Sequence, residues 1–380
     1  MDARATGNKR NMTGAPATLR SAADLVEAGL LPESKRDAIE RLAATYAIGI
    51  TGAVAELIDR GDPHDPVARQ FVPDLAELAS QPGEMADPTG DLRFSPVEGI
   101  VHRYPDRVLL KLLHICPVYC RFCFRRAVVG PSSATHLSPD ALNAATGYIA
   151  RNPAIWEVIL TGGDPLTLSA RRLAGIMARL KAIDHVKILR LHTRVPIADP
   201  STITAELAGI LLSAGKTIYV ALHANHPREL SGAARAACAR LIDAGIPMLS
   251  QSVLLAGVND DIETLTKLMR AFVETRIKPY YLHQLDPAPG TAHFRVPVAK
   301  GRDLVRQLRG NVSGLCQPHY MLDIPGGHGK SPIGPNYLAE RSSGDAYWVT
   351  DYKGRSHIYP PGARASGEMR RDLELPWEPD

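Results

Sequence analysis

The sequence lacks a long apolar run, a block of like charge and a paired set of cysteines. No stretch is long and apolar enough for a membrane helix, so a membrane protein is not expected. The first twenty residues are not followed by an apolar segment, which argues against a secretory signal. We expect a cytoplasmic protein, with a transit peptide as the alternative. The formal net charge is only +4 and the basic residues are scattered, so no nucleic-acid partner is expected.

Cysteine is scarce, and the five residues present are unevenly distributed. Three of them fall within residues 116–123, which favours a metal site in a reducing compartment over a disulfide framework. Cys238 has helical spacing to Ala234 and Leu241, so we expect it in the core. Cys316 is expected to be a buried or free thiol and not a fourth ligand of the metal site.

Three regions differ in pattern along the chain. Residues 1–98 contain short helical segments and turn-rich loops, and are expected to form an N-terminal helical region. Residues 99–290 alternate between strand-like and helical segments, and are expected to form the main domain. Residues 291–380 add a helical stretch, a strand-like segment and a polar end with several Gly and Pro. Apart from the strand–helix rhythm, the sequence has no internal repeat.

An apolar, β-branched run recurs six times in the middle of the chain. The runs fall at residues 107–116, 156–163, 186–195, 217–225, 247–255 and 278–285. Amphipathic helical stretches lie between them at residues 170–183, 204–215, 232–245 and 261–276. Strands that alternate with helices form parallel βαβ units with right-handed crossovers, so an α/β fold is expected.

The positions of the polar residues favour a barrel over a doubly wound open sheet, which fits the same number of strands. Polar residues or glycines stand at the ends of six successive strands: Cys116, Gly162–Asp164, Arg194, His223, Gln251 and Asp286. Side chains at the carboxyl ends of parallel strands converge on one face, where such folds place their chemistry. The expected fold is a partial (βα)6 barrel of TIM type, with an N-terminal helical region and a C-terminal extension.

Cys116, Cys120 and Cys123 form the pattern C-x3-C-x2-C directly after the first predicted strand. Cysteine thiolates are the ligands of iron–sulfur clusters, and three of them can hold three corners of a [4Fe-4S] cubane. The fourth iron then stays open, as one position does in a catalytic zinc site. A structural zinc site is an alternative, although it normally needs a second pair of cysteines, and chance clustering is another.

The cysteine pattern resembles that of the radical S-adenosylmethionine superfamily, whose barrel carries it after the first strand. The segment TGGDP at residues 161–165 is similar to the glycine-rich loop of that superfamily. The resemblance implies that Gly162, Gly163 and Asp164 contact S-adenosylmethionine, whose amino and carboxylate groups bind the open iron. On its own, such a segment is more often a tight corner between a strand and a helix.

Five further segments resemble the lysine 2,3-aminomutase family of that superfamily, over about residues 60–350. They are VHRYPDRVLL, SQSVLLAGVND, YYLHQLD, TAHFRVPVAKG and LDIPGGHGKSP, in the order in which the family has them. The resemblance implies conversion of L-lysine to β-lysine by a radical 1,2-amino shift. It also implies three cofactors, namely a [4Fe-4S] cluster, S-adenosylmethionine and pyridoxal 5′-phosphate.

The resemblance assigns four residues to pyridoxal phosphate. Lys330, within PGGHGK, matches the lysine that binds the aldehyde of the cofactor, and the glycines allow a flat ring to approach. Arg103 and Arg107 match positions near the phosphate, which guanidinium groups bind well, and Tyr104 packs nearby. Without the resemblance, Lys330 reads as a solvated lysine on a flexible loop.

The resemblance also assigns the substrate site. Arg125 matches the arginine that binds the substrate carboxylate, and Asp286 and Asp323 match two aspartates that hold the distal ammonium of lysine. His223 and Gln251 match positions around S-adenosylmethionine. Without the resemblance, each aspartate taken singly would be interpreted as a loop cap or a surface charge. Two carboxylates favour lysine, leave arginine as an alternative substrate and repel glutamate.

Three features depart from the fermentative lysine aminomutases. No cysteine follows Cys316, so their C-terminal zinc-binding cysteines are missing, and His328 stands where they tend to have glycine. Phe122 and Phe124 are closer to the shorter branch that makes β-lysine for elongation factor P. That branch typically lacks the second aspartate, which this chain keeps as Asp323. The same reaction in the service of elongation factor P is therefore an alternative function.

Two other classes of protein compete with this interpretation. A different radical enzyme, such as an epimerase or methyltransferase, would show no pyridoxal absorption band, and the complete Lys330 loop argues against it. An iron–sulfur electron carrier or sensor would not cleave S-adenosylmethionine, and it usually has four cysteine ligands. The expected partners are L-lysine, an electron donor such as flavodoxin or ferredoxin, and further copies in a homo-oligomer.

Overall fold

The computed structural model of the protein describes residues 18–130, 135–340 and 346–360. The N-terminal stretch considered for a leader lies largely outside these ranges. The contacts divide the chain into two units, Met1–Gly334 and Pro335–Asp380. The expected boundaries near residues 98 and 290 stay predictions. Among the described residues, no helix has the length and apolarity needed to cross a membrane.

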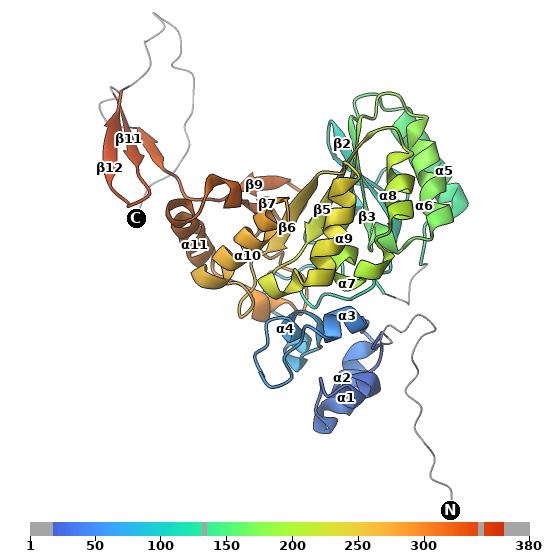
Figure 1. Ribbon diagram of the computed structural model, residues 1–380, viewed down its shortest axis with the longest axis horizontal. Coiled ribbons are helices and arrows are strands. Elements are labelled where there is room, and N and C mark those ends of the chain that lie inside the picture. Colours follow the sequence, from blue (N-terminus) through green and yellow to red (C-terminus); the bar gives the residue numbers. More distant parts are fainter. Residues whose placement is uncertain (1–17, 131–134, 341–345, 361–380) are drawn as a thin grey trace, which may run out of the picture. The chain divides into compact units, whose positions relative to one another are not determined.

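The larger unit contains a nine-stranded sheet (Figure 1). Neighbouring strands of this sheet follow one another in the sequence, from β1 at one edge to β9 at the other. The strands are β1 (Ile100–Tyr104), β2 (Arg107–Leu113), β3 (Glu157–Gly162), β4 (Ile188–Thr193), β5 (Thr217–His223), β6 (Met248–Val253), β7 (Ile277–His283), β8 (His319–Asp323) and β9 (Lys330–Pro332). Each strand from β2 to β7 is parallel to the next, while β1 is antiparallel to β2 and β9 is antiparallel to β8. The six predicted strands are β2 to β7. Because β1 and β9 end the strand order, the sheet is an open barrel, which confirms the expected fold.

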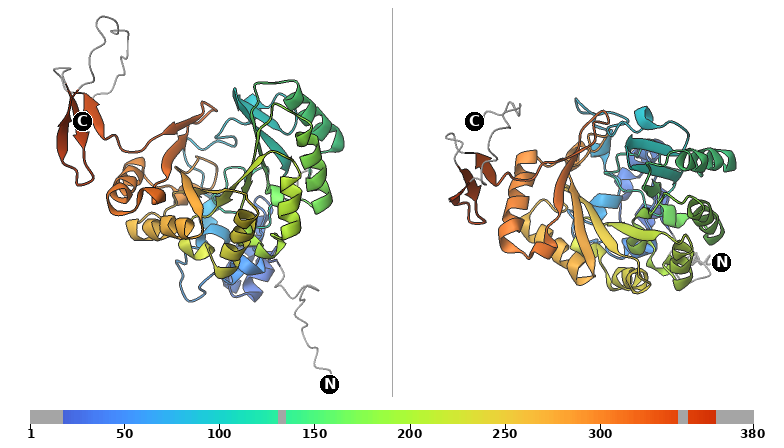
Figure 2. Two further views of the ribbon diagram at one scale, coloured as in Figure 1. Left: turned by 45° about the horizontal axis from the view of Figure 1, so that its top comes forward. Right: turned by 90° about the horizontal axis from the view of Figure 1, so that it is seen from above.

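Helices cover the outer face of the curved sheet (Figure 2). They are α5 (Pro139–Ala150), α6 (Ala170–Lys181), α7 (Val195–Ala198), α8 (Ala205–Leu212), α9 (Gly232–Asp243), α10 (Ile262–Glu274) and α11 (Val298–Asn311). Five of them begin after a side chain that accepts a hydrogen bond from the first turn: Ser138, Ser169, Thr204, Ser231 and Asp261. Each such cap stabilises its helix by about 1 kcal/mol, so these helix starts are encoded locally.

The strands place apolar side chains toward the helices and polar side chains toward the interior of the barrel. In β4, Leu189 and Leu191 are fully buried in the main core. Because side chains alternate along a strand, Arg190 and His192 point to the other face of the sheet. There, the ring of His192 lies 5.5 Å from that of His223 on β5. The interior face is therefore left for polar chemistry.

The N-terminal region forms a second core against the cysteine loop. Its helices are α1 (Ala22–Glu27), α2 (Arg36–Ala43), α3 (Gly52–Ala55) and α4 (Ala68–Phe71). Leu42 and Phe71, both fully buried, belong to the same apolar cluster as Val118 of the cysteine loop. The backbone N–H of Tyr119 also donates to the carbonyl oxygen of Gly49, at 3.0 Å. The N-terminal region thus holds the cysteine loop in place.

The smaller unit contains a separate antiparallel sheet that the sequence pattern does not indicate. Its strands are β10 (Leu338–Glu340), β11 (Tyr347–Thr350) and β12 (Ser356–Tyr359). Each has only three or four residues, which is too short for an alternating pattern to stand out.

Candidate active site

Cys116, Cys120 and Cys123 lie in the loop after β2 as free, partly exposed thiols. Burial raises the pKa of Cys116 well above its usual value, and the charges of Asp164 and the other two cysteines raise it further. Burial also raises the pKa of Cys120 to about 11. Such thiols stay protonated at neutral pH unless a metal replaces the proton. The loop therefore suits a metal cluster better than a free nucleophile.

Positive charge surrounds the cysteine loop and suits an anionic iron–sulfur cluster. The charge of Arg194 lowers the pKa of Cys120, against the larger effect of burial, and Arg125 and Arg126 act in the same way on Cys123. Within the described ranges, no three His, Cys, Asp or Glu side chains are grouped to hold a single metal ion. A cubane does not require such a group, because each cysteine binds a different iron.

A buried carboxylate that the sequence reasoning did not find supports the same loop. Arg121 Nη2 pairs with Glu77 Oε2 at 2.5 Å, and Arg126 pairs with the same oxygen. Arg121 Nη1 donates to the carbonyl of Ala47 at 2.8 Å, and Arg126 Nη1 donates to that of Gly290 at 3.1 Å. Arg121 is thereby bound to the N-terminal region, and Arg126 is bound both to that region and to the loop after β7.

Gly162 and Gly163 bring the end of β3 against the cysteine loop. A Cβ on Gly163 would lie 2.0 Å from the carbonyl oxygen of Ile115, and one on Gly162 would lie 2.3 Å from that of Leu113. Gly162 also has a φ of +120°, which L side chains rarely adopt. The backbone N–H of Asp164 donates to Ile115 at 2.9 Å. Close backbone approach is therefore one reason for the two glycines.

The carboxylate of Asp164 connects the ends of β3 and β4. It accepts hydrogen bonds from the backbone N–H of Leu166 (3.1 Å), the hydroxyl of Thr193 (2.7 Å) and the backbone N–H of Arg194 (2.7 Å). Burial raises the pKa of Asp164, and these hydrogen bonds act against it. Both carboxylate oxygens already have protein donors, and the expected contact with S-adenosylmethionine stays a prediction.

Three neighbouring strands present buried polar atoms to the interior of the barrel. His192 Nε2, His223 Nε2 and Gln251 Oε1 have no hydrogen-bond partner among the described residues. Burial, reinforced by the charge of Arg194, lowers the pKa of His223 to about 3, so its ring is neutral. Buried polar atoms are nearly always hydrogen-bonded in native proteins. The interior therefore fits a polar ligand such as S-adenosylmethionine.

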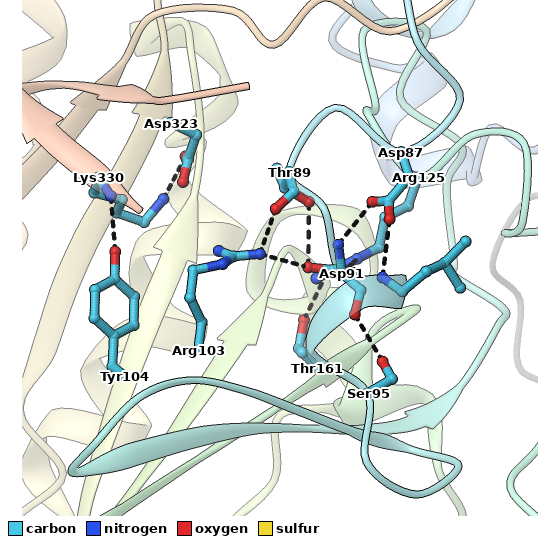
Figure 3. Close-up of polar contacts among 11 residues, drawn as sticks. Asp87, Thr89, Asp91, Ser95, Arg103, Tyr104, Arg125, Thr161, Asp323 and Lys330 are labelled. Atoms are coloured by element: carbon cyan, nitrogen blue, oxygen red, sulfur yellow. Dashed lines mark hydrogen bonds and ion pairs between the residues drawn. The ribbon is translucent and has the colours of Figure 1, made fainter. Parts of the chain in front are cut away.

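A chain of polar contacts runs from Gln251 to Lys330. Gln251 Nε2 lies 2.9 Å from His283 Nε2, and His283 Nδ1 lies 3.5 Å from Asp323 Oδ2. Lys330 Nζ donates to the same oxygen of Asp323 (Figure 3). Burial and the charge of Lys330 lower the pKa of His283, so its ring is neutral at pH 7. With its proton on Nδ1 toward Asp323, His283 accepts from Gln251 at Nε2 and leaves Gln251 Oε1 free for a ligand.

Lys330 follows a glycine-rich loop, and a hydrogen bond from its backbone fixes its position. Its backbone N–H donates to the hydroxyl of Tyr104 at 2.7 Å. A Cβ on Gly329, which has a φ of +94°, would lie 3.1 Å from that hydroxyl. A Cβ on Gly327 would lie 2.6 Å from the ring of Phe94. The glycines let the loop that carries Lys330 fit closely against these two rings.

Asp286 and Asp323 have pKa values shifted in opposite directions. Burial and the charge of Asp323 raise the pKa of Asp286 to about 7. Burial also acts to raise the pKa of Asp323, but the hydrogen bond from His283 and the charge of Lys330 outweigh it and hold that pKa far below its usual range. In the part of the chain that the structure describes, no hydrogen bond or ion pair engages the carboxylate of Asp286. A buried ammonium group would stabilise both carboxylates.

Three predicted arginines contact Asp91 or Tyr104. Arg125 Nη2 pairs with Asp91 Oδ2 at 2.9 Å, and Arg103 Nη2 pairs with Asp91 Oδ1 at 3.3 Å. Arg107 lies over the ring of Tyr104, 3.8 Å from its centroid. Arg103 Nε is buried without a hydrogen-bond partner among the described residues, so it can donate to an anion. The three arginines therefore fit a phosphate and a carboxylate.

The structure brings together predicted residues that are far apart in the sequence. Lys330, Asp323 and Arg125 all act on the charge of Asp286. Sequence reasoning missed several residues that support them: Glu77, Asp91, His192 and His283. His283 lies within the segment YYLHQLD, which carried the resemblance and was a usable clue. Asp91 stands in a turn-rich segment whose pattern gives no such clue.

Two protein-family models match the chain. Residues 110–269 match the radical SAM superfamily, and residues 305–368 match the model described as Lysine-2,3-aminomutase. The L-lysine 2,3-aminomutase of Acetoanaerobium sticklandii is 41% identical over 82% of this chain and 75% of its own length. That of Clostridium subterminale is 39% identical over 82% of this chain and 74% of its own. The glutamate 2,3-aminomutase of Clostridioides difficile is 34% identical over 82% of this chain and 74% of its own length.

Proposed function

The chain belongs to the lysine 2,3-aminomutase family of radical S-adenosylmethionine enzymes, and we propose on that basis that it converts L-lysine to β-lysine. It is an isomerase that moves an amino group between adjacent carbon atoms, with a [4Fe-4S] cluster, S-adenosylmethionine and pyridoxal 5′-phosphate as cofactors. The pair of carboxylates beside Lys330 is the observation that carries the choice of substrate.

Asp286 and Asp323 suit a substrate with a distal positive charge. Asp323 is ionised, and its charge helps to raise the pKa of Asp286 to about 7. A substrate ammonium between the two would lower that pKa again and bind both carboxylates. In the ligand-free protein the ammonium of Lys330 engages Asp323. The distal ammonium of a bound lysine would engage the same carboxylate, which the ammonium of Lys330 shows to be a cation site.

The same carboxylates argue against glutamate, which a relative at 34% identity is named for. The side-chain carboxylate of glutamate would face Asp286 and Asp323, and like charges in a buried site repel strongly. The two relatives at 41% and 39% identity are named for lysine, which favours lysine over arginine. Neither name refers to elongation factor P, so a role in its modification is not favoured.

Each cofactor has residues that fit it. Cys116, Cys120 and Cys123 would hold the cluster; Lys330, Arg103, Arg107 and Tyr104 would hold pyridoxal phosphate; and Gly162, Gly163, Asp164, His223 and Gln251 would surround S-adenosylmethionine. When bound, the cluster and S-adenosylmethionine supply a radical that abstracts hydrogen, and pyridoxal phosphate carries the migrating nitrogen. The neutral ring of His223 and the free oxygen of Gln251 are hydrogen-bonding groups that add no charge to the interior.

The remaining residues position the substrate. Arg125 would hold its carboxylate, because a guanidinium group can bind a carboxylate through two hydrogen bonds. Asp286 and Asp323 would hold the other end, so the chain of lysine is fixed at both ends. Fixing both ends places the reacting carbon atoms and contributes to the rate through orientation.

We also propose that the enzyme works in the cytoplasm, as a homo-oligomer, with flavodoxin or ferredoxin as its electron donor. All five cysteines are free thiols, which supports a reducing compartment. A small protein donor suits a cluster whose cysteine loop is partly exposed.

The test is anaerobic reconstitution of the full chain, followed by assay with S-adenosylmethionine, pyridoxal phosphate and a reductant. L-Lysine, L-arginine and L-glutamate are supplied separately, and products are identified by mass spectrometry. We expect β-lysine from the wild type and none from Lys330→Ala, because the variant cannot bind the aldehyde covalently. Cleavage of S-adenosylmethionine without a product from lysine would agree with the radical chemistry but would refute the assignment of lysine as the substrate.

A further inference from the structure

Asp91 connects the two arginines that the proposed function assigns to anionic groups. Arg125 donates to Asp91 Oδ2 from Nε at 3.2 Å and from Nη2 at 2.9 Å. Arg103 donates to Asp91 Oδ1 from Nη2 at 3.3 Å (Figure 3). The three side chains are only 11% to 14% exposed, so both ion pairs are largely shielded from water. One carboxylate thus links two cations in the site.

Asp91 is itself held in place by its neighbours. The carboxylate of Asp87 accepts hydrogen bonds from the backbone N–H groups of Asp91 and Leu92, each at 2.9 Å. The hydroxyl of Thr89 donates to Asp91 Oδ1 at 3.2 Å. The carbonyl oxygen of Thr89 accepts a hydrogen bond from Arg103. The segment around Asp91 is therefore arranged to keep its carboxylate in one orientation.

The same segment packs against the loop that carries Lys330. The backbone N–H of Gly326 donates to the carbonyl oxygen of Pro88 at 3.2 Å. A Cβ on Gly90 would lie only 2.7 Å from the backbone nitrogen of Gly327. Asp91 is thus placed relative to the cofactor lysine by direct backbone contacts.

The contacts with Asp91 leave other donors available. In Arg125, Nε and Nη2 face Asp91, while Nη1 lies 3.4 Å from the hydroxyl of Thr161, which is a long hydrogen bond. A guanidinium group has five N–H donors in one rigid plane, so its outer edge can still bind a carboxylate. In Arg103, the buried Nε lacks a partner within the described residues.

We propose that Asp91 is a positioning residue that orients Arg125 toward the carboxylate of lysine and Arg103 toward the phosphate of the cofactor. The inference rests on the proposed function, from which it takes both arginine roles. Arg125, Lys111 and Arg103 hold the pKa of Asp91 below its usual value although burial opposes them, so the carboxylate stays charged. Without it, three neighbouring cations would repel one another and the guanidinium planes would turn away.

The test compares Asp91→Asn, which keeps the shape and removes the charge, with Asp91→Glu, which keeps the charge. Ser95→Ala is the matched control, because the hydroxyl of Ser95 donates to the backbone carbonyl of Asp91 at 2.8 Å and not to its carboxylate. Three quantities are measured on the full, reconstituted chain. They are the KM for lysine, the inhibition constant of 1,5-diaminopentane, which is lysine without its carboxylate, and the affinity for pyridoxal phosphate by absorbance titration.

For Asp91→Asn we expect the KM for lysine to rise about ten- to a hundredfold, as for loss of a hydrogen bond to a charged group. The inhibition constant of the diamine should change less than about twofold, because the diamine does not use Arg125. Affinity for pyridoxal phosphate should fall through Arg103. Asp91→Glu should recover most of both losses, and Ser95→Ala should match the wild type.

Equal effects on lysine and the diamine would refute positioning and indicate a general structural role. No change in any of the three quantities, or the same pattern in Ser95→Ala, would also refute it. If Asp91→Asn does not fold, a wild-type pattern in Asp91→Glu supports the charge role, and a loss of lysine affinity equal to that for the diamine refutes it. A wild type without β-lysine formation would refute the proposed function, whereas the titration with pyridoxal phosphate would still test the link to Arg103.

Discussion

At the scale of single residues, the site depends on carboxylates whose charge is set by their neighbours. Asp323 is ionised because His283 and Lys330 hold its pKa down, whereas burial and Asp323 itself raise the pKa of Asp286 to about 7. Two interacting aspartates therefore have pKa values that differ widely. The state of Asp286 should change with pH in a range where the enzyme is assayed.

The first prediction concerns the pH dependence of lysine binding. The raised pKa means that Asp286 is protonated below about pH 7 and charged above it, so it attracts an ammonium group only at the higher pH. We expect the KM for lysine to fall as the pH rises from about 6 to about 8. In Asp286→Asn the KM should be high and should not change over that range. A wild-type KM that is constant in this range would contradict the assignment.

The second prediction concerns His283, which links Asp323 to Gln251. His283→Phe removes both hydrogen bonds and keeps an aromatic ring of similar size. Because a hydrogen bond to a charged group contributes about 1.5–3 kcal/mol, the KM for lysine should rise by about tenfold or more. The absorbance of bound pyridoxal phosphate should be unchanged, because Lys330 is intact. Loss of the cofactor band in this variant would indicate a collapsed site instead.

Sequence reasoning identified the residues that resemble a known family and missed those that only support them. Lys330 and the three cysteines lie in short segments with a recognisable pattern. Asp91 acts on Arg125 from 34 positions earlier, through a contact that exists only after the segment and the barrel have packed together. No local pattern encodes such a contact, so the positioning residues had to be read from the structure.

At the scale of elements, the strands and most of the helix starts follow from local rules. The apolar runs predicted β2 to β7, and Ser, Thr or Asp caps begin five of the helices. The edge strand β9 follows from tertiary contacts instead, because it has three residues and pairs with β8 after a glycine-rich loop. The sequence therefore indicated the chemistry of Lys330 but not the strand that carries it.

The third prediction tests the close approach between β3 and the cysteine loop. In Gly163→Ala the new methyl group would collide with the carbonyl oxygen of Ile115, so the loop must move. We expect a lower iron content after reconstitution, measured per chain. Gly175→Ala in α6 is the control, because nothing lies within 4 Å of its added Cβ. That control should keep its iron and gain about 0.5–1 kcal/mol of stability.

At the scale of the whole molecule, the N-terminal region is part of the active site. It supplies Glu77 to the arginines of the cysteine loop, and Asp91 to Arg125 and Arg103. From the sequence, this region was expected only as a helical addition before the barrel. The part that this region plays in the site could not be predicted, because it depends on tertiary packing. The apolar core of the N-terminal helices includes Val118 of the cysteine loop.

The fourth prediction follows from that second core. Leu42→Ala removes a fully buried side chain of α2, and Leu241→Ala does the same in the main core. Each should lower the free energy of unfolding by about 2–5 kcal/mol. At a temperature where both variants are folded, only Leu42→Ala should lose iron faster than the wild type. The reason is that Leu42 belongs to the apolar core that packs against the cysteine loop. Equal rates of iron loss from Leu42→Ala and Leu241→Ala would contradict the prediction that the N-terminal core stabilises the cysteine loop.

The open barrel has a consequence for how the enzyme is assembled. A side chain links its first and last strands, because the hydroxyl of Tyr104 on β1 accepts a hydrogen bond from the backbone N–H of Lys330 on β9. A closed barrel would have sealed this seam with backbone hydrogen bonds. The side chain of Lys330 stands at the seam and keeps 29% of its surface exposed. We therefore expect that the aldehyde cofactor can bind to Lys330 and be replaced after the chain has folded, without opening the main apolar core.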